Sequence, residues 1–181
     1  MDQQGKVRRF DEIFTTHLDA AYDYARWLTR DERNAEDVVQ EACLRAFKFI
    51  DSFHGESGRA WLLAIVRNTY YTWLRKNQAD ALSVPFEDET MVAEGQELVD
   101  PGSLGEMDRL LNQRDARRII NGALEQLPEE FREVIVLREL EDLSYKEIAV
   151  IAKIPLGTVM SRLARGRKLL LQHLQRAQRE S

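Results

Sequence analysis

Hydroxyl and basic side chains recur at helical spacing near the C-terminal end of this chain of 181 residues. Ser161, Arg165 and Lys168 are three or four positions apart, so one face of a helix carries all three. Arginine on such a face can bind guanine edges or phosphates, and the small residues Ser161 and Ala164 let the backbone approach a groove. The pattern therefore predicts a DNA-binding surface.

A short helix precedes this face. Ser144 and Glu147 form a capping box, and Leu143 with Ile148 stands at the two positions of a hydrophobic staple. These signals predict a helix that starts at Tyr145.

Pro155 and Gly157 interrupt the pattern and predict a turn, with a second helix beginning between Pro155 and Thr158. The inner face of that helix is apolar and consists of Val159, Leu163, Leu170 and Leu174. Two helices joined by a short turn, with the second basic on its outer face, describe a helix-turn-helix. The alternatives are a helical hairpin with a solvated basic face and an amphipathic helix that binds a membrane or a calmodulin-like partner.

Few residues could support catalysis. The three histidines, His17, His54 and His173, belong to different predicted elements, and Cys43 is the single cysteine. The sequence contains no nucleophile elbow, phosphate loop or metal-spaced ligand cluster. We therefore expect no catalytic residues, no metal and no cofactor, and we interpret Cys43 as a small buried hydrophobic residue.

Charge is distributed unevenly along the chain. The net charge is −5, yet residues 143–181 carry eight basic and two acidic residues, whereas residues 79–113 carry nine acidic residues and one arginine. A local basic stripe is typical of a polyanion binder even in an acidic chain. The acidic stretch has no periodic apolar face, which predicts a flexible linker.

Helical periodicity defines a block on each side of this linker. In residues 1–78 apolar spacing predicts three helices: residues 10–28, a second over residues 39–50 with Asn34 as N-cap, and a third from about Arg59 to Lys76. In residues 114–181 periodic residues precede Pro128, which fits the first position of a new helix. The predicted fold class is all-α: two small helical domains, 1–78 and 114–181, joined by the linker 79–113 and moving independently.

Three stretches carry a family resemblance. Residues 127–170, "LPEEFREVIVLRELEDLSYKEIAVIAKIPLGTVMSRLARGRKLL", resemble the promoter-binding C-terminal domain of bacterial sigma factors. "AEDVVQEACLRAFKFI" and "WLLAIVRNTYYTWLRK" resemble the first conserved domain of the extracytoplasmic-function (ECF) group. The resemblance implies a dissociable subunit that binds core RNA polymerase and promoter DNA and directs transcription initiation.

The same resemblance implies roles for individual residues. Polymerase-binding positions are Asp37, Gln40, Glu41 and Arg45, and Lys48 is added because helical spacing places it on the same exposed face as Asp37 and Glu41. Positions for the −10 element, where aromatic and basic groups hold single-stranded DNA, are His54, Gly55, Ser57, Trp61, Arg67 and Asn68. Positions for the −35 element are Thr158, Met160, Ser161, Arg162, Ala164, Arg165 and Lys168.

The chain departs from the family pattern at several positions. Tyr70 and Tyr71 are bulkier than the common aliphatic residues, Thr72 stands where many relatives are acidic, and Met160 stands where they are often basic. These departures leave open the details of the −10 contacts and the −35 preference. Trp61 is open to two interpretations, a −10 contact or a core residue, whereas Trp73 is expected in the core.

Two other functions are compatible with the residues alone. One is a stand-alone helix-turn-helix regulator with an N-terminal dimerisation or sensor domain, and the other is a helical adaptor that binds only protein. The resemblance also implies an anti-sigma factor as a partner. Because the sequence contains no long apolar run and no secretory signal, we expect a cytoplasmic protein without membrane insertion.

Overall fold

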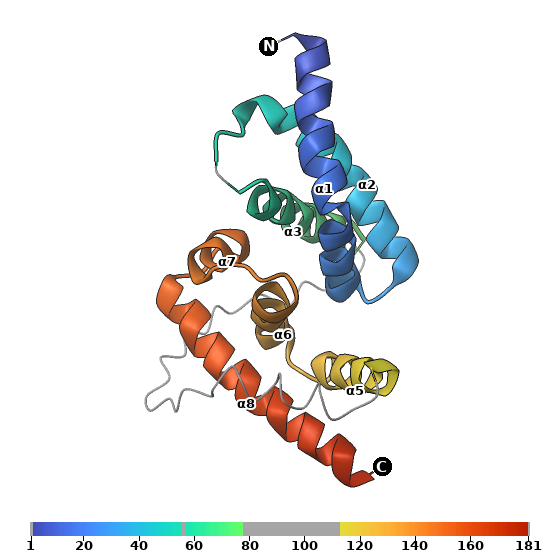
Figure 1. Cartoon of the computed structure of the whole chain (residues 1–181), viewed down its shortest axis with the longest axis vertical. Coiled ribbons are helices and arrows are strands. Elements are labelled where there is room, and N and C mark those ends of the chain that lie inside the picture. Colours follow the sequence, from blue (N-terminus) through green and yellow to red (C-terminus); the bar gives the residue numbers. More distant parts are fainter. Residues whose placement is uncertain (1, 56, 78–112, 181) are drawn as a thin grey trace.

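The computed structural model describes residues 2–55, 57–77 and 113–180, which form two helical blocks (Figure 1). The first block contains α1 (Gln3–Thr29), α2 (Glu32–Phe49), the 3₁₀ turn η1 (Ile50–Ser52) and α3 (Gly58–Asn77). The second contains α5 (Gln113–Glu125), α6 (Glu129–Ile135), the π-helical turn η2 (Val136–Leu140), α7 (Tyr145–Ala152) and α8 (Leu156–Glu180). None of the described residues is in a strand, which confirms the all-α prediction.

Side-chain caps define the helix starts of the first block. The predicted N-cap of α2, Asn34, is wrong: Asp31 is the cap, and its Oδ1 accepts from the Asn34 amide at 2.9 Å. The cap lies further upstream because Arg30 adopts a left-handed conformation (φ 57°) that ends α1 and leaves Asp31 extended. Helix α1 packs against α2 and α3, with the buried Tyr24 and Leu62 in the core.

Helix α8 is the centre of the second block, and α5, α6 and α7 pack against it. All four residues of the predicted inner face, Val159, Leu163, Leu170 and Leu174, are buried. Pro128 was predicted as the first residue of a helix. It is instead the N-cap of α6, one position before the first helical residue. Buried Arg132 ties α6 to the end of α5 by donating to the carbonyl oxygens of Leu124 (2.9 Å) and Leu127 (2.6 Å).

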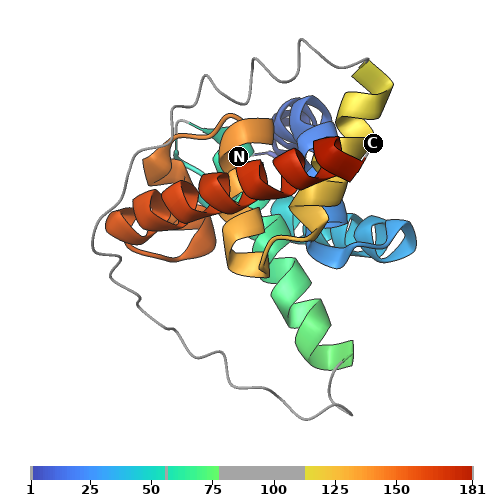
Figure 2. The same cartoon turned by 90° about the horizontal axis from the view of Figure 1, so that it is seen from below.

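The two blocks are in contact, with α3 of the first packed against α7 of the second (Figure 1). The hydroxyl of Tyr24 in α1 donates to the Glu133 carboxylate in α6 at 2.8 Å. The two blocks therefore pack against each other in this structure, and their independent movement stays a prediction. Seen from below, α8 crosses the second block while one end of α3 projects away from it (Figure 2). The predicted linker, residues 79–113, lies outside the described residues apart from Gln113.

Candidate functional site

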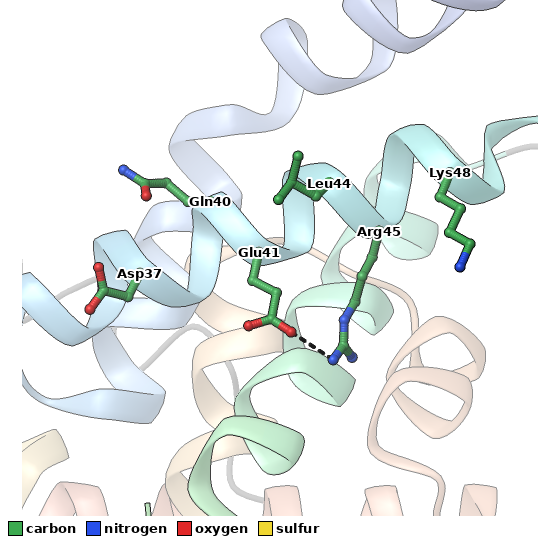
Figure 3. Close-up of a pocket in the computed structure, with 6 residues that line it drawn as sticks. All are labelled: Asp37, Gln40, Glu41, Leu44, Arg45 and Lys48. Atoms are coloured by element: carbon green, nitrogen blue, oxygen red, sulfur yellow. Dashed lines mark hydrogen bonds and ion pairs between the residues drawn. The ribbon is translucent and has the colours of Figure 1, made fainter. Parts of the chain in front are cut away.

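One group of predicted residues forms a surface on α2. It lines a shallow hollow of about 480 Å³, and the residues of this α2 surface are Asp37, Gln40, Glu41, Leu44, Arg45 and Lys48 (Figure 3). Asp37, Gln40 and Lys48 are exposed, and Arg45 donates to Glu41 at 2.8 Å one turn away. The structure thus brings all five predicted polymerase-binding positions together on one accessible helix face.

Leu44 is the member of this surface that the sequence analysis missed. Its side chain is 72% exposed and projects on the same side of α2 as Gln40, away from the Glu41–Arg45 pair (Figure 3). A leucine at a position off the apolar face of a helix is the signal that could have identified it, because buried residues of α2 such as Ala42 and Ala46 follow a different stripe. An exposed aliphatic group rimmed by charges fits a protein-binding surface.

The second group forms what we call the α3 surface: His54, Gly55, Ser57, Trp61, Arg67 and Asn68. His54, Gly55 and Asn68 are exposed. Trp61 is half-buried and packs on Phe53, with ring centroids 5.0 Å apart.

The loop before α3 is held by backbone and ring contacts. The Ser57 hydroxyl accepts from the Ala60 amide at 3.1 Å at the start of α3. Arg9 of α1 lies over the Phe53 ring at 5.5 Å and donates to the Phe53 carbonyl oxygen. These contacts fix the loop beside the indole of Trp61. Trp73, predicted in the core, is half-buried and packs against the core cluster.

Arg67 turns towards the second block, as does Ser57, whose hydroxyl donates to the Glu147 carboxylate at 3.3 Å. Nε of Arg67 donates to the carboxylate of Glu133, and its guanidinium lies 4.6 Å from the centre of the Tyr71 ring. Burial alone lowers the pKa of the Arg67 guanidinium, but the charge and hydrogen bond of Glu133 outweigh burial and raise that pKa. Arg67 is therefore held cationic and paired.

The predicted helix-turn-helix is confirmed as α7, a turn and α8. Ser144 accepts from the Glu147 amide at 3.1 Å, as the capping box predicts, and α7 starts at Tyr145. Lys153 ends α7 in a left-handed conformation (φ 57°) with its amide donating to the Ala149 carbonyl oxygen. The carbonyl oxygen of Pro155 accepts from the Thr158 amide at 3.0 Å at the start of α8.

The third group lies on α8, and we call it the α8 surface: Thr158, Met160, Ser161, Arg162, Ala164, Arg165 and Lys168. Met160, at 48% exposed, and Lys168 are accessible, and Arg165 is half-buried. Ala164 is only 8% exposed, so it adds little to the accessible part of this surface. The remaining members still form an outward face at helical spacing.

No group of three or more histidine, cysteine, aspartate or glutamate side chains in residues 2–55, 57–77 and 113–180 could hold a metal ion. No helix within these ranges is long and apolar enough to cross a membrane.

Models of two protein regions match the chain, one on each block. Residues 13–79 match the model described as Sigma-70 region 2, and residues 117–170 match the model described as Sigma-70, region 4. The α2 and α3 surfaces lie within the first match, and the α8 surface lies within the second.

Curated relatives and solved structures cover most of the chain. It is 35% identical to the ECF RNA polymerase sigma-E factor of Haemophilus influenzae, across 96% of this chain and 91% of that protein. It is 38% identical to the sigma-E factor of Escherichia coli, across 74% and 70%. The sigma factor RpoE of Bartonella quintana, solved in complex with the anti-sigma factor NepR, is 28% identical with a TM-score of 0.68 and covers 92% of this chain and 96% of that one.

Proposed function

This chain belongs to the ECF group of the sigma-70 family and is a transcription initiation factor, and from that membership we propose how its surfaces divide the work. Such a factor binds core RNA polymerase and directs it to promoters. We assign core binding to the α2 surface, −10 recognition and melting to the α3 surface, and −35 recognition to the α8 surface. Residues 1–78 and 114–181 are then the two functional domains, joined by the linker 79–113.

The observation that carries this assignment is the separation of two kinds of surface on two blocks. Helix α2 presents exposed Leu44 among charges, which suits a protein partner. Helix α8, the second helix of the helix-turn-helix, presents Arg165 and Lys168, which suits the major groove. A stand-alone regulator needs no surface of the first kind, and the family membership does not favour that alternative.

Further partners follow from the family. The relative from Bartonella quintana was solved with an anti-sigma factor, and we propose that a protein of that class also binds this chain. Chemistry belongs to the polymerase in this proposal: the chain itself is no enzyme, needs no cofactor and works in the cytoplasm, where its polymerase is.

Reconstituted transcription tests the assignment. Purified chain, core RNA polymerase and a pool of genomic fragments are incubated together, and the 5′ ends of the transcripts are sequenced. We expect transcripts that share −35 and −10 elements and that form only when both proteins are present. Binding to a palindrome as a dimer without polymerase, and no new transcripts with it, would overturn the assignment.

A further inference from the structure

Two cations near the start of α1 contact the connection between α2 and α3. Lys6 pairs with Asp51 in η1, with Nζ and Oδ2 3.4 Å apart, and lies 5.1 Å from the centre of the Phe47 ring. One turn later, Arg9 lies 5.5 Å from the centre of the Phe53 ring and donates from Nη2 to the Phe53 carbonyl oxygen. Both cations therefore join α1 to the segment that leads into the α3 surface.

Phe53 is the apolar centre of this segment. It is only 9% exposed, and its ring packs on Trp61 with the ring centroids 5.0 Å apart. A Cβ atom on Gly55 would lie 3.1 Å from Cε2 of Phe53, so the backbone at Gly55 runs directly against the ring. Gly55 and Trp61 belong to the α3 surface, and so does His54, which stands between Phe53 and Gly55 in the chain. The position of Phe53 thus sets the positions of three residues assigned to −10 DNA.

Arg9 holds Phe53 at two points with one planar group. Its guanidinium is attracted to the face of the ring, and its Nη2 bonds the oxygen of the peptide that joins Phe53 to His54. Because a peptide unit is rigid, a bond to its oxygen fixes the direction of the backbone towards His54. The Phe53 amide donates to the Ile50 carbonyl oxygen at 3.1 Å, which fixes the peptide on the other side of Phe53.

We propose that Arg9 is a positioning residue for −10 recognition: through Phe53 it keeps the loop and Trp61 in the arrangement that holds single-stranded −10 DNA. This inference rests on the proposed assignment of the α3 surface. Arg9 was not among the positions implied by the family motif, and the region 2 match begins after it, at residue 13. Its half-buried side chain bonds the backbone of the chain itself, so it acts on DNA through the loop.

Reconstituted transcription tests this role. The full chain and its Arg9→Ala variant are each combined with core polymerase on one promoter and on templates with single substitutions in the −10 or the −35 element. The matched control is Arg8→Ala, which removes the same charge from the adjacent position. The Arg8 side chain is 84% exposed and pairs with Glu12 at 3.3 Å on the outside of α1. Because alanine favours a helix, both variants should retain α1.

The expected result is a loss of −10 preference. Losing one base stacked on an aromatic ring lowers binding about fivefold or more. We therefore expect Arg9→Ala to lower the preference for the intact −10 element over substituted ones at least about fivefold, with the −35 preference unchanged. Arg8→Ala should behave as the wild type on every template. Equal −10 preferences in the two variants, or a loss in Arg9→Ala that is the same on all templates, would overturn the proposal.

A double-mutant cycle tests whether Arg9 acts through Phe53. Removing Arg9 from a Phe53→Leu protein should change the −10 preference less than removing it from the wild type, because residues in contact have effects that do not add. Equal effects of Arg9→Ala in the two backgrounds would show that Arg9 acts elsewhere and would overturn the proposal.

Salt dependence separates positioning from a direct phosphate contact. Each phosphate contact contributes about 0.9 to the slope of log affinity against log salt concentration. Promoter binding by polymerase with Arg9→Ala should keep the wild-type slope. A slope reduced by about 0.9 would mean that Arg9 itself binds a phosphate and would overturn the positioning role.

Two further measurements keep the outcomes distinct. Arg9→Met keeps the apolar stem of the side chain without an N–H donor, so it covers the case in which Arg9→Ala fails to fold, and the same loss of −10 preference is expected. Wild-type preference in folded Arg9→Met would overturn the proposal. Transcription by the wild type is measured in parallel: its absence defeats the proposed function, whereas its presence with unaltered −10 preference in Arg9→Ala defeats the positioning role alone.

Discussion

Gly166 of α8 and Ile135 of α6 approach so closely that the glycine has no room for a side chain. A Cβ atom on Gly166 would lie 2.9 Å from Cγ1 of Ile135, whose side chain is fully buried. Glycine costs about 1 kcal/mol relative to alanine inside a helix, so its presence here reflects packing rather than helix preference. The contact sets how near α6 lies to the DNA-binding helix.

Gly166→Ala should therefore lower the free energy of unfolding by about 1–3 kcal/mol, because the extra methyl group forces α6 and α8 apart. The control is Gly122→Ala in α5, where an added Cβ meets nothing within 4 Å and should raise stability by up to about 1 kcal/mol. Urea unfolding of both variants measures the difference. If both variants gain the same free energy of unfolding, the close approach of Gly166 and Ile135 leaves room for a methyl group.

Arg132 should be essential to the second block. Its guanidinium donates to three carbonyl oxygens at the end of α5, so Arg132→Ala leaves buried acceptors unpaired. We expect a loss of about 2–4 kcal/mol in the free energy of unfolding. Exposed Arg118→Ala should change it by no more than about 0.5 kcal/mol. Comparable melting temperatures for the two variants would contradict the capping role.

Arg165→Ala should weaken promoter recognition at the −35 element. A bidentate contact to guanine predicts a loss of about 1–3 kcal/mol confined to one base pair, whereas a phosphate contact weakens all sequences alike. Run-off transcription on templates with single −35 substitutions separates these cases. Exposed Arg179→Ala, at the end of α8, is the control. Unchanged activity of a folded Arg165→Ala protein would show that Arg165 takes no part in −35 recognition.

Reversing two charges on the α2 surface should abolish binding to core polymerase. Asp37→Lys with Glu41→Lys changes the accessible face, and stability should shift by no more than about 0.5 kcal/mol, since neither side chain is in the core. Co-purification with core enzyme measures binding. Glu32→Lys with Glu36→Lys alters the same helix outside the hollow and should leave binding intact. A large loss of thermal stability would show that the carboxylates serve the fold.

Alkaline pH should destabilise the protein through its buried tyrosines. Burial, with the nearby carboxylate of Glu129, raises the pKa of Tyr70 from 10.0 to about 12, and burial with Glu133 raises the pKa of Tyr24 and Tyr71. The folded state then holds protons that the unfolded state releases, so stability is intact below pH 10 and falls as pH rises from 10 to 12. Urea midpoints at pH 9, 10 and 11 and absorbance at 295 nm should show this. If all five tyrosines of the folded protein titrate near pH 10, the predicted loss of stability has no basis.

Local features of the fold follow from the sequence. Ser144 with Glu147 specifies the start of α7, because a capping box involves residues three positions apart. The sequence specifies the start of α2 less well, because Asp31 and Asn34 are both good N-caps. The left-handed conformation of Arg30 selects Asp31.

The α2 surface was predicted from the family motif, yet the motif did not include Leu44. The contact between the blocks could not be predicted by periodicity at all. Glu133 follows Arg132 in a stretch that reads as an apolar helix, and its partner Arg67 is 66 positions away. Periodicity identifies which face of a helix is buried but does not identify a polar partner that is distant in the chain.

That sequence distance has a consequence for synthesis. A ribosome adds about 5–20 residues per second, so the 66 positions between Arg67 and Glu133 take roughly 3–13 seconds to translate. During this interval the first block leaves the ribosome with Arg59 and Arg67 hydrated and no carboxylate to pair them. The first block is therefore without these two pairs until Glu133 and Glu141 have been translated.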